Sequence, residues 1–332
     1  MTIIERLQKN GIRRMGTPKR GFRYRSPSGR VSREDVARIE ALKIPPAWKD
    51  VAISATATPA VQAVGRDAAG RWQYLYHEAH AARRERRKEE RLARFIRVLP
   101  KMRRAMARDL ALPGIAEKKV LAGVLKILGA CFLRPGSKVY ADQNKSYGLA
   151  TLRRQHVSVK GDVVRFDYTG KSGKRQHHEL RDRKIAGMVR ELVRYPGEVF
   201  KFRSDDGAVR DVTAAHINAY IKEVTGEQFT AKDFRTWAGT LLCACALARG
   251  GPPARGSKQE RKKRIAAAMR EVAQHLGNTP AVCRSSYVSP IVLRRFEQGR
   301  ILGRHLDDVA ALQDGDSRAV ERSERALLEL IK

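Results

Sequence analysis

The pattern of apolar and polar positions divides the chain into a strand-rich beginning and a largely helical remainder. Residues 44–54 and 70–80 are short runs with interleaved aromatic residues, a pattern typical of β-strands. From residue 83 to 104, apolar residues recur instead at helical spacing among many basic ones. We therefore place a domain boundary near residue 90, with residues 1–90 forming a small domain and residues 91–332 a larger one.

Within the larger part, the periodicity predicts helices interrupted by one strand-rich section. Helices are expected at residues 116–132, 213–224 and 258–276, and another begins at the capping-box pattern of residues 230–233. Residues 157–181 alternate like two β-hairpins, with turns at 160–162 and 170–173. The motif of a phosphate-binding P-loop needs a glycine at the position of Arg165, so Lys171 is interpreted as a lysine at a hairpin tip.

The stretch from residue 274 to 290, QHLGNTPAVCRSSYVSP, contains several helix-boundary signals close together. Gly277 suits the end of one helix, and Thr279 and Pro280 suit the N-cap and first residue of the next. This places Asn278 in a loop and Tyr287 two helical turns further on. Alone, the stretch is equally consistent with a helical corner that has a tyrosine in the core and with a functional site.

The charge of the chain indicates a polyanionic partner. Among 332 residues, 68 are Lys or Arg and 35 are Asp or Glu, which gives a net charge of +33. Such an excess favours nucleic acid, with a membrane surface as the weaker alternative. The longest apolar run, residues 237–248, is too short to cross a bilayer, and the N-terminus lacks the apolar segment of a signal peptide. We expect a cytoplasmic, nucleoid-associated protein.

Several segments carry more specific expectations. The first dozen residues are interpreted as a solvated or disordered basic arm, and residues 249–264 as a mobile basic loop facing phosphates. The acidic residues 305–332 are expected to pack as helix. Arg235 lies in the first turn of a helix, one residue off its buried face, where a cation opposes the helix dipole; this suggests an anionic ligand. The four cysteines fit no zinc spacing and are expected in the core, and we expect no metal and no cofactor.

Four segments, taken in order, resemble the active-site segments of type IB DNA topoisomerases, specifically the compact bacterial and poxvirus-like branch. They are CFLRPGSKVYADQNKSYGLATLRRQHV, YTGKSGK, FTAKDFRTWAGT and LGNTPAVCRSSYV, which begin at residues 131, 168, 229 and 276. IPPAWKDV and GRWQYLYH, from residues 44 and 70, extend the resemblance over nearly the whole chain. The resemblance implies an α+β fold, with a small β-rich N-terminal domain and a mainly α catalytic domain that carries a small antiparallel sheet.

The same resemblance implies a catalytic set. The family's two arginines, its hairpin lysine and its nucleophile fall on Arg134, Arg235, Lys171 and Tyr287. A fifth position, His in poxvirus and nuclear enzymes, is Asn278 here, as in bacterial relatives. The implied activity is ATP-independent relaxation of supercoiled double-stranded DNA through a 3′-phosphotyrosyl intermediate. The enzyme would work as a monomer that clamps the duplex.

Contacts to DNA outside the reaction centre are also implied. The resemblance suggests that Gln73, Tyr74 and Tyr76 contact DNA in the groove and that Lys232 touches a phosphate. Poxvirus enzymes have lysines on both sides of the position of Lys138. This chain has Ser137 and Val139 there, so no site preference is carried over.

Two other functions stay open at this stage. A tyrosine recombinase uses a similar Arg/Lys/Arg/Tyr set, but its second arginine usually follows a histidine three residues earlier, where this chain has Lys232. A non-catalytic architectural DNA-binding protein would explain the charge equally well. It would not explain why all four catalytic positions match.

Overall fold

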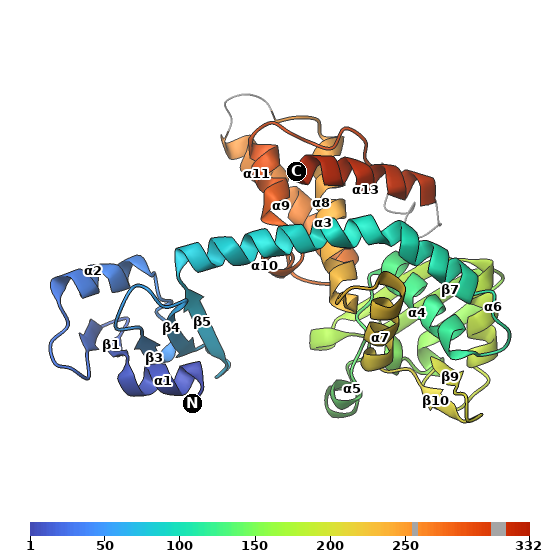
Figure 1. Cartoon of the computed structure of the whole chain (residues 1–332), viewed down its shortest axis with the longest axis horizontal. Helices are drawn as coiled ribbons and strands as arrows, with labels where there is room; N and C mark the ends of the chain where they lie inside the picture. Colours follow the sequence, from blue (N-terminus) through green and yellow to red (C-terminus); the bar gives the residue numbers. More distant parts are fainter. Residues whose placement is uncertain (254–257, 307–316) are drawn as a thin grey trace. The chain divides into compact units, whose positions relative to one another are not determined.

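The computed structural model describes residues 1–253, 258–306 and 317–332 (Figure 1). Its internal contacts divide the chain into two compact units, Met1–Arg87 and Lys88–Lys332. The division falls inside helix α3 (Glu78–Asp109), whose first turns belong to the first unit and whose longer remainder belongs to the second.

The first unit is built on a five-stranded antiparallel sheet in the order β2-β1-β3-β4-β5. The strands are β1 (Ile12–Thr17), β2 (Gly21–Arg25), β3 (Lys49–Ile53), β4 (Val61–Arg66) and β5 (Trp72–Tyr76). Alternate residues of β3 point to opposite faces. Val51 and Ile53 pack with Ile39 of α2 (Arg33–Ala41), and Ala52 packs with Leu7 of α1 (Ile3–Asn10). One small helix therefore covers each face of the sheet.

The expectation of a disordered arm over the first dozen residues is wrong. Thr2 and Glu5 form a reciprocal capping box, with the Thr2 amide 2.8 Å from a Glu5 carboxylate oxygen and the Glu5 amide 3.2 Å from the Thr2 hydroxyl. Leu7 and Ile12 are buried. The prediction gave weight to the many charged residues and overlooked a short apolar stripe. This stripe and the capping box hold α1 against the sheet.

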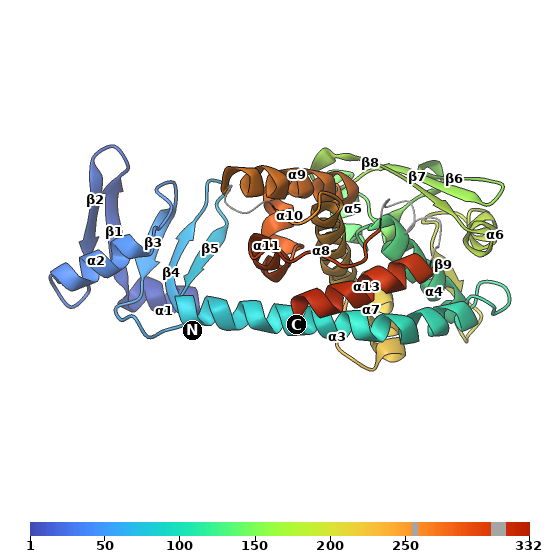
Figure 2. The same cartoon turned by 90° about the horizontal axis from the view of Figure 1, so that it is seen from above.

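The second unit is mainly helical. Besides α3, its helices are α4 (Glu117–Cys131), α5 (Lys138–Asn144), α6 (Arg183–Leu192), α7 (Ala214–Thr225), α8 (Ala231–Arg249), α9 (Lys258–Leu276), α10 (Pro280–Ser286), α11 (Pro290–Glu297) and α13 (Ser317–Ile331). Its strands are β6 (Val157–Lys160), β7 (Val163–Thr169), β8 (Arg175–Arg181), β9 (Lys201–Arg203) and β10 (Val209–Asp211). The antiparallel sheet β6-β7-β8 lies beside α4 and α6 (Figure 2). The α+β fold class expected from the sequence is confirmed.

Helix α4 lies at the centre of this unit. It contacts α6, α7 and α8 as well as β8 and β9, and nearly all its residues beyond the first turn are buried. The helix ends where Phe132 adopts a left-handed conformation, with φ of +55°. Phe132 is buried, so packing holds this unfavourable conformation for a non-glycine residue. The turn sends the chain out of the core into Arg134.

Helix α8 is fixed at its N-terminal end by a bidentate ion pair. The guanidinium of Arg91 in α3 donates to both carboxylate oxygens of Asp233, at 2.6 and 2.7 Å. Asp233 also accepts from the Thr230 amide at 2.8 Å and so closes the predicted capping box. This arrangement fixes the first turns of α8, from which Lys232 and Arg235 project.

Helices at 116–132, 213–224 and 258–276 and the two hairpins at 157–181 are found close to their expected bounds. The expected basic loop at 249–264 is shorter, because α9 already begins at Lys258; residues 254–257 lie outside the described part. Within the acidic segment 305–332, α13 is helical as expected, and residues 307–316 are not described. No helix of the described ranges is long and apolar enough to cross a membrane.

The buried hydrogen bond from Tyr220 to Asp109 gives a test of this packing. The Tyr220 hydroxyl donates to a carboxylate oxygen of Asp109 at 2.7 Å, and both residues are buried. Tyr220→Phe leaves that acceptor unsatisfied, so the free energy of unfolding should fall by roughly 1–3 kcal/mol. Urea unfolding followed by circular dichroism measures the change. Tyr195→Phe, at a half-buried tyrosine of the same unit, is the control, and equal stabilities of both variants would contradict the assignment.

Candidate active site

The turn between α9 and α10 is built as its sequence predicts. Gly277 has φ of +61°, which glycine adopts without strain, and the Asn278 amide then donates to the Ala273 carbonyl at 3.0 Å. The Thr279 hydroxyl accepts from the Val282 amide at 3.3 Å, as an N-cap does. Tyr287 follows the last turn of α10 as its C-cap. The loop thus holds Asn278 and Tyr287 at the two ends of one short helix.

Arg235 is buried, with only 3% of its surface exposed. Its guanidinium donates to the Phe132 carbonyl through Nη1 and to the Leu276 carbonyl through Nη2, the latter at 2.7 Å. These carbonyls lie at the ends of α4 and α9. The sequence analysis placed Arg235 one residue off the buried face of its helix; the structure places it inside the core, because two helix ends converge on it.

Tyr287 lies against this guanidinium. The Arg235 Cζ atom is 4.8 Å from the centre of the Tyr287 ring, a cation–π distance. Burial of Tyr287 opposes ionisation, yet the positive charges of Arg235, Arg134 and Lys232 outweigh it and lower the pKa of the phenol below its usual value. Burial, and next the charge of Arg134, lower the pKa of Arg235 in turn. The phenol is therefore prepared for ionisation by its cationic neighbours.

Arg134 and Asn278 are joined directly. A guanidinium nitrogen of Arg134 donates to the Asn278 side-chain oxygen. A guanidinium carries only donors, so the amide oxygen must face it and the amide nitrogen is directed elsewhere. That nitrogen is buried and makes no hydrogen bond of ordinary geometry to the residues described; its contact with the Cys283 thiol is at most a weak one. Asn278 thus keeps one uncommitted neutral donor beside two arginines.

Lys171 is exposed at the turn between β7 and β8. Ser172 and Gly173 both have positive φ, +64° and +72°, which tightens the turn directly after the lysine. The predicted hairpin tip is confirmed. The flexible side chain of Lys171 stands at the rim, whereas Arg235 is held rigidly in the floor.

One cleft brings these residues together. Its volume is about 330 Å³. Its lining includes Arg134, Lys171, Arg235 and Tyr287, and also Lys232. Four cations around one phenol suit an anionic group such as a phosphodiester, because guanidinium and ammonium groups donate charge-assisted hydrogen bonds to its oxygens. Of the expected catalytic set, only Asn278 is absent from this lining. Its side chain is hydrogen-bonded to Arg134, which does line the cleft.

The sequence analysis missed part of the lining: Ser137, Tyr140, Ser146 and Tyr147. Their place depends on a close approach of two loops. A β carbon at Gly148 would lie 2.5 Å from the Gly136 Cα atom, so both glycines allow the chain to fold back beside Arg134. The only available signal was the pair of glycines inside the segment that follows Arg134, and their contact cannot be read from spacing.

The expected DNA-contacting residues of β5 divide between its two faces. Tyr74 and Tyr76 are exposed on one face, with ring centres 6.3 Å apart. Gln73 points the other way, and its amide donates to Asp67 at 2.9 Å. Asp67 also binds Arg71, and chiefly this bond lowers the pKa of the Asp67 carboxyl to about 2. The amide of Gln73 is thus already engaged within its own unit.

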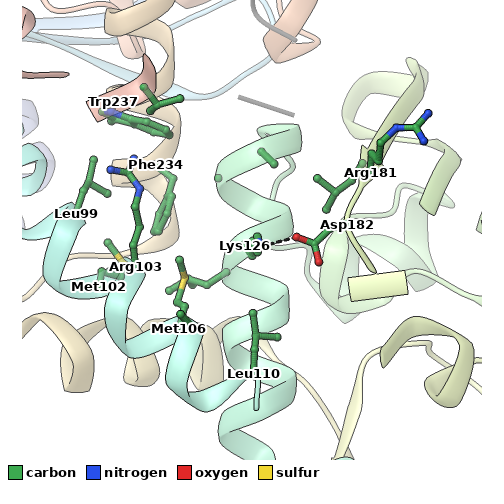
Figure 3. Close-up of a pocket in the computed structure, with 16 residues that line it drawn as sticks. Leu99, Met102, Arg103, Met106, Leu110, Lys126, Arg181, Asp182, Phe234 and Trp237 are labelled. Atoms are coloured by element: carbon green, nitrogen blue, oxygen red, sulfur yellow. Dashed lines mark hydrogen bonds and ion pairs between the residues drawn. The ribbon is translucent and has the colours of Figure 1, made fainter. Parts of the chain in front are cut away.

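A second cavity of about 310 Å³ lies elsewhere in the same unit. Apolar side chains of α3 and α8 line it, among them Leu99, Met102 and Trp237, and an ion pair between Lys126 and Asp182 stands at one side (Figure 3). None of the expected catalytic side chains is in its lining. The four cysteines are all buried, as expected, and none of them forms a disulfide.

Comparison with known proteins finds relatives over most of the chain. Residues 78–298 match the family described as eukaryotic DNA topoisomerase I, catalytic core, and residues 21–67 match the N-terminal domain of bacterial DNA topoisomerase IB. DNA topoisomerase 1B of Acanthamoeba polyphaga mimivirus is 34% identical over 284 residues, which cover 83% of this chain and 84% of that protein. DNA topoisomerase 1B of Vaccinia virus (strain Copenhagen) is 21% identical over 241 residues, covering 72% and 73%.

The catalytic-core match covers most of the chain, and the mimivirus relative is 34% identical over most of both proteins. The resemblance seen in the four segments is confirmed. This chain belongs to the type IB DNA topoisomerases.

Proposed function

We propose that this protein relaxes supercoiled double-stranded DNA by cutting and resealing one strand, without ATP and with Tyr287 as the nucleophile. The observation that supports this most directly is the cleft in which the phenol of Tyr287 lies against Arg235 and faces Arg134, Lys171 and Lys232. A phenol beside paired arginines is suited to attack on a phosphodiester.

The proposed cleavage step is a transesterification. The Tyr287 oxygen forms a bond to phosphorus, and the bond from phosphorus to the 5′-oxygen breaks. The product is a 3′-phosphotyrosyl ester and a free 5′-hydroxyl. One ester replaces another, so the bond energy is kept and the reverse reaction reseals the strand after rotation.

Proton movement assigns two roles. The phenol must lose its proton, and the lowered pKa of Tyr287 next to Arg235 favours this. The departing 5′-oxygen is a strongly basic alkoxide and must gain a proton. Lys171 stands at the rim of the cleft with an ammonium group, so we assign it as the general acid.

The remaining groups stabilise charge. The non-bridging oxygens of phosphorus become more negative as the nucleophile attacks, and Arg134 and Arg235 offer paired, permanently charged donors to them. The free amide nitrogen of Asn278 adds a neutral donor. Lys232, exposed in the first turn of α8, is proposed to hold a phosphate of the same strand.

We further propose how the chain engages its substrate. Residues 91–332 act as the catalytic domain, and residues 1–90 as a DNA-clamping domain through Tyr74, Tyr76 and Gln73. The net charge of +33 supports binding to the phosphate backbone. The protein is proposed to act as a monomer, because each proposed catalytic residue comes from one chain. Its proposed location is the nucleoid of the cytoplasm.

Replacing the nucleophile tests the proposal most directly. Tyr287→Phe removes one oxygen, so the fold and DNA affinity should be kept while cleavage and plasmid relaxation are abolished. The wild-type protein, mixed with duplex labelled at either end and analysed on a denaturing gel, should become linked to a 3′-phosphate. Peptide mapping should place the linkage on Tyr287. Linkage to a 5′-phosphate or to another tyrosine would overturn the mechanism, and Tyr195→Phe serves as the matched control.

The role of Lys171 can be separated from charge stabilisation. Lys171→Ala should slow cleavage of ordinary DNA by about 10²–10⁴-fold, the usual contribution of general acid catalysis. A substrate with sulfur in place of the 5′-bridging oxygen has a much less basic leaving group and should restore most of the rate. An equal defect on both substrates would show that Lys171 stabilises charge instead.

The same sulfur substrate exposes the ionisation of Tyr287, because departure of the leaving group no longer depends on Lys171. Cleavage should then rise with pH through the pKa of the phenol. Since Lys232 helps to lower that pKa, Lys232→Gln should move the midpoint to higher pH. Quenched time courses of cleavage across a pH series measure the midpoint. Lys160→Gln, at the turn on the opposite end of the sheet, is the control. A midpoint that moves to lower pH would contradict the electrostatic account.

A further inference from the structure

Gln176 has no assigned role in the reaction, although its side chain lies between two loops of the active site. It sits in β8 opposite Tyr168 of β7, and its side chain points inward with 8% of its surface exposed. Its amide nitrogen donates to the backbone carbonyl of Arg175 at 3.0 Å. This bond fixes the direction of the side chain.

Two glycines contact this side chain. A β carbon placed on Gly170 would lie 2.9 Å from the Gln176 Cγ atom, and one placed on Gly277 would lie 2.5 Å from its Oε1 atom. Carbon and oxygen atoms do not approach so closely without displacement. The Gln176 side chain therefore spans the space between the backbones at 170 and 277 and rests directly on both.

The positions of these glycines are informative. Gly170 directly precedes Lys171, and Gly277 directly precedes Asn278. Gly277 has φ of +61°, so its turn already favours glycine. Gly170 has φ of −93°, a value that any residue can adopt, so the backbone conformation does not require glycine there. The contact with Gln176 is what requires a residue without a side chain at 170.

We propose that Gln176 is a positioning residue that sets the distance between the turn carrying Lys171 and the turn carrying Asn278. This inference rests on the proposed function, in which both residues act on the same phosphodiester. Lys171 protonates the 5′-oxygen and Asn278 binds a non-bridging oxygen, so the two turns must keep one spacing. Gln176 has the length to maintain it, and its hydrogen bond to the Arg175 carbonyl fixes the direction of its amide.

Shortening this side chain should therefore act on the reaction rather than on DNA binding. A displacement of about 1 Å in a reacting group can lower the rate about 10²-fold. Gln176→Ala should slow cleavage of ordinary DNA by that order. With the sulfur substrate the loss should be smaller, because the Lys171 proton is no longer needed. Gln176→Met keeps the length and most of the volume but loses the hydrogen bond to the Arg175 carbonyl, so it should retain more of the rate than Gln176→Ala.

Gly170→Ala gives a reciprocal test. The added methyl group would push against Cγ of Gln176 and displace it, so cleavage of ordinary DNA should again fall about 10²-fold. In Gly170→Ala/Gln176→Ala the methyl group occupies space that the glutamine has left. The double variant should then cleave faster than Gly170→Ala alone, which independent effects would not allow.

The experiment measures single-turnover cleavage of both substrates by these variants, together with their melting temperatures and DNA affinities. Gly187→Ala, at an exposed helical glycine with open space around it, and Gln155→Ala, at an exposed glutamine, are the matched controls and should keep the wild-type rate. Loss of cleavage with wild-type affinity, partial recovery on sulfur and rescue in the double variant support the proposal.

Other results overturn it. If Gln176→Ala cleaves ordinary DNA at the wild-type rate, or if the double variant shows the full product of the two single defects, Gln176 does not set this spacing. If Gly170→Ala does not fold, the test of the proposal is the comparison of Gln176→Ala with Gln176→Met on the two substrates. Equal cleavage rates of these two variants would then count against the proposal. A wild-type protein that cleaves neither substrate would instead refute the proposed function.

Discussion

The arrangement of the site depends on burying the charge of Arg235. A guanidinium removed from water is costly unless its donors are satisfied. Here the Phe132 and Leu276 carbonyls, at the C-terminal ends of α4 and α9, accept two of them. Helix C-termini also carry partial negative charge, which further stabilises a cation. The C-terminal ends of two helices thus both bind one arginine of α8.

This arrangement determines where the other groups lie. The end of α4 leads into Arg134, and the end of α9 leads into Asn278, so the same two helix ends that neutralise Arg235 also start the two loops. The guanidinium still has its Nε donor without a partner among the described residues, and one face lies against the Tyr287 ring. A buried arginine that is only partly satisfied by protein is suited to bind an anionic substrate. In the proposed reaction, a phosphate oxygen of the DNA would accept the hydrogen bond that Arg235 does not make within the protein.

The sequence predicted the local features of this site well. The capping box at Thr230, the glycine turn at Gly277 and the hairpin tip at Lys171 each follow from residues adjacent in the chain, and each is present. The depth of Arg235 could not be predicted, because it depends on carbonyls more than 40 residues away in sequence. For the same reason the lining residue Tyr147 was missed. In the first unit, Leu7 was overlooked because charge count was given more weight than a short apolar stripe.

Glycine contacts explain how loops can hold reacting groups in fixed places. Gly239 lies against Tyr287, where a β carbon would come within 3.0 Å of the tyrosine carbonyl oxygen. Gly136 and Gly148 meet beside Arg134, and Gly170 meets Gln176 just before Lys171. In each case the backbone next to a proposed catalytic residue is in direct contact with another part of the chain. A side chain such as lysine loses much conformational entropy when it is held by its tip. Fixing the backbone next to Lys171 narrows the region that its ammonium group samples. The side chain still keeps enough freedom to follow the 5′-oxygen in the proposed reaction.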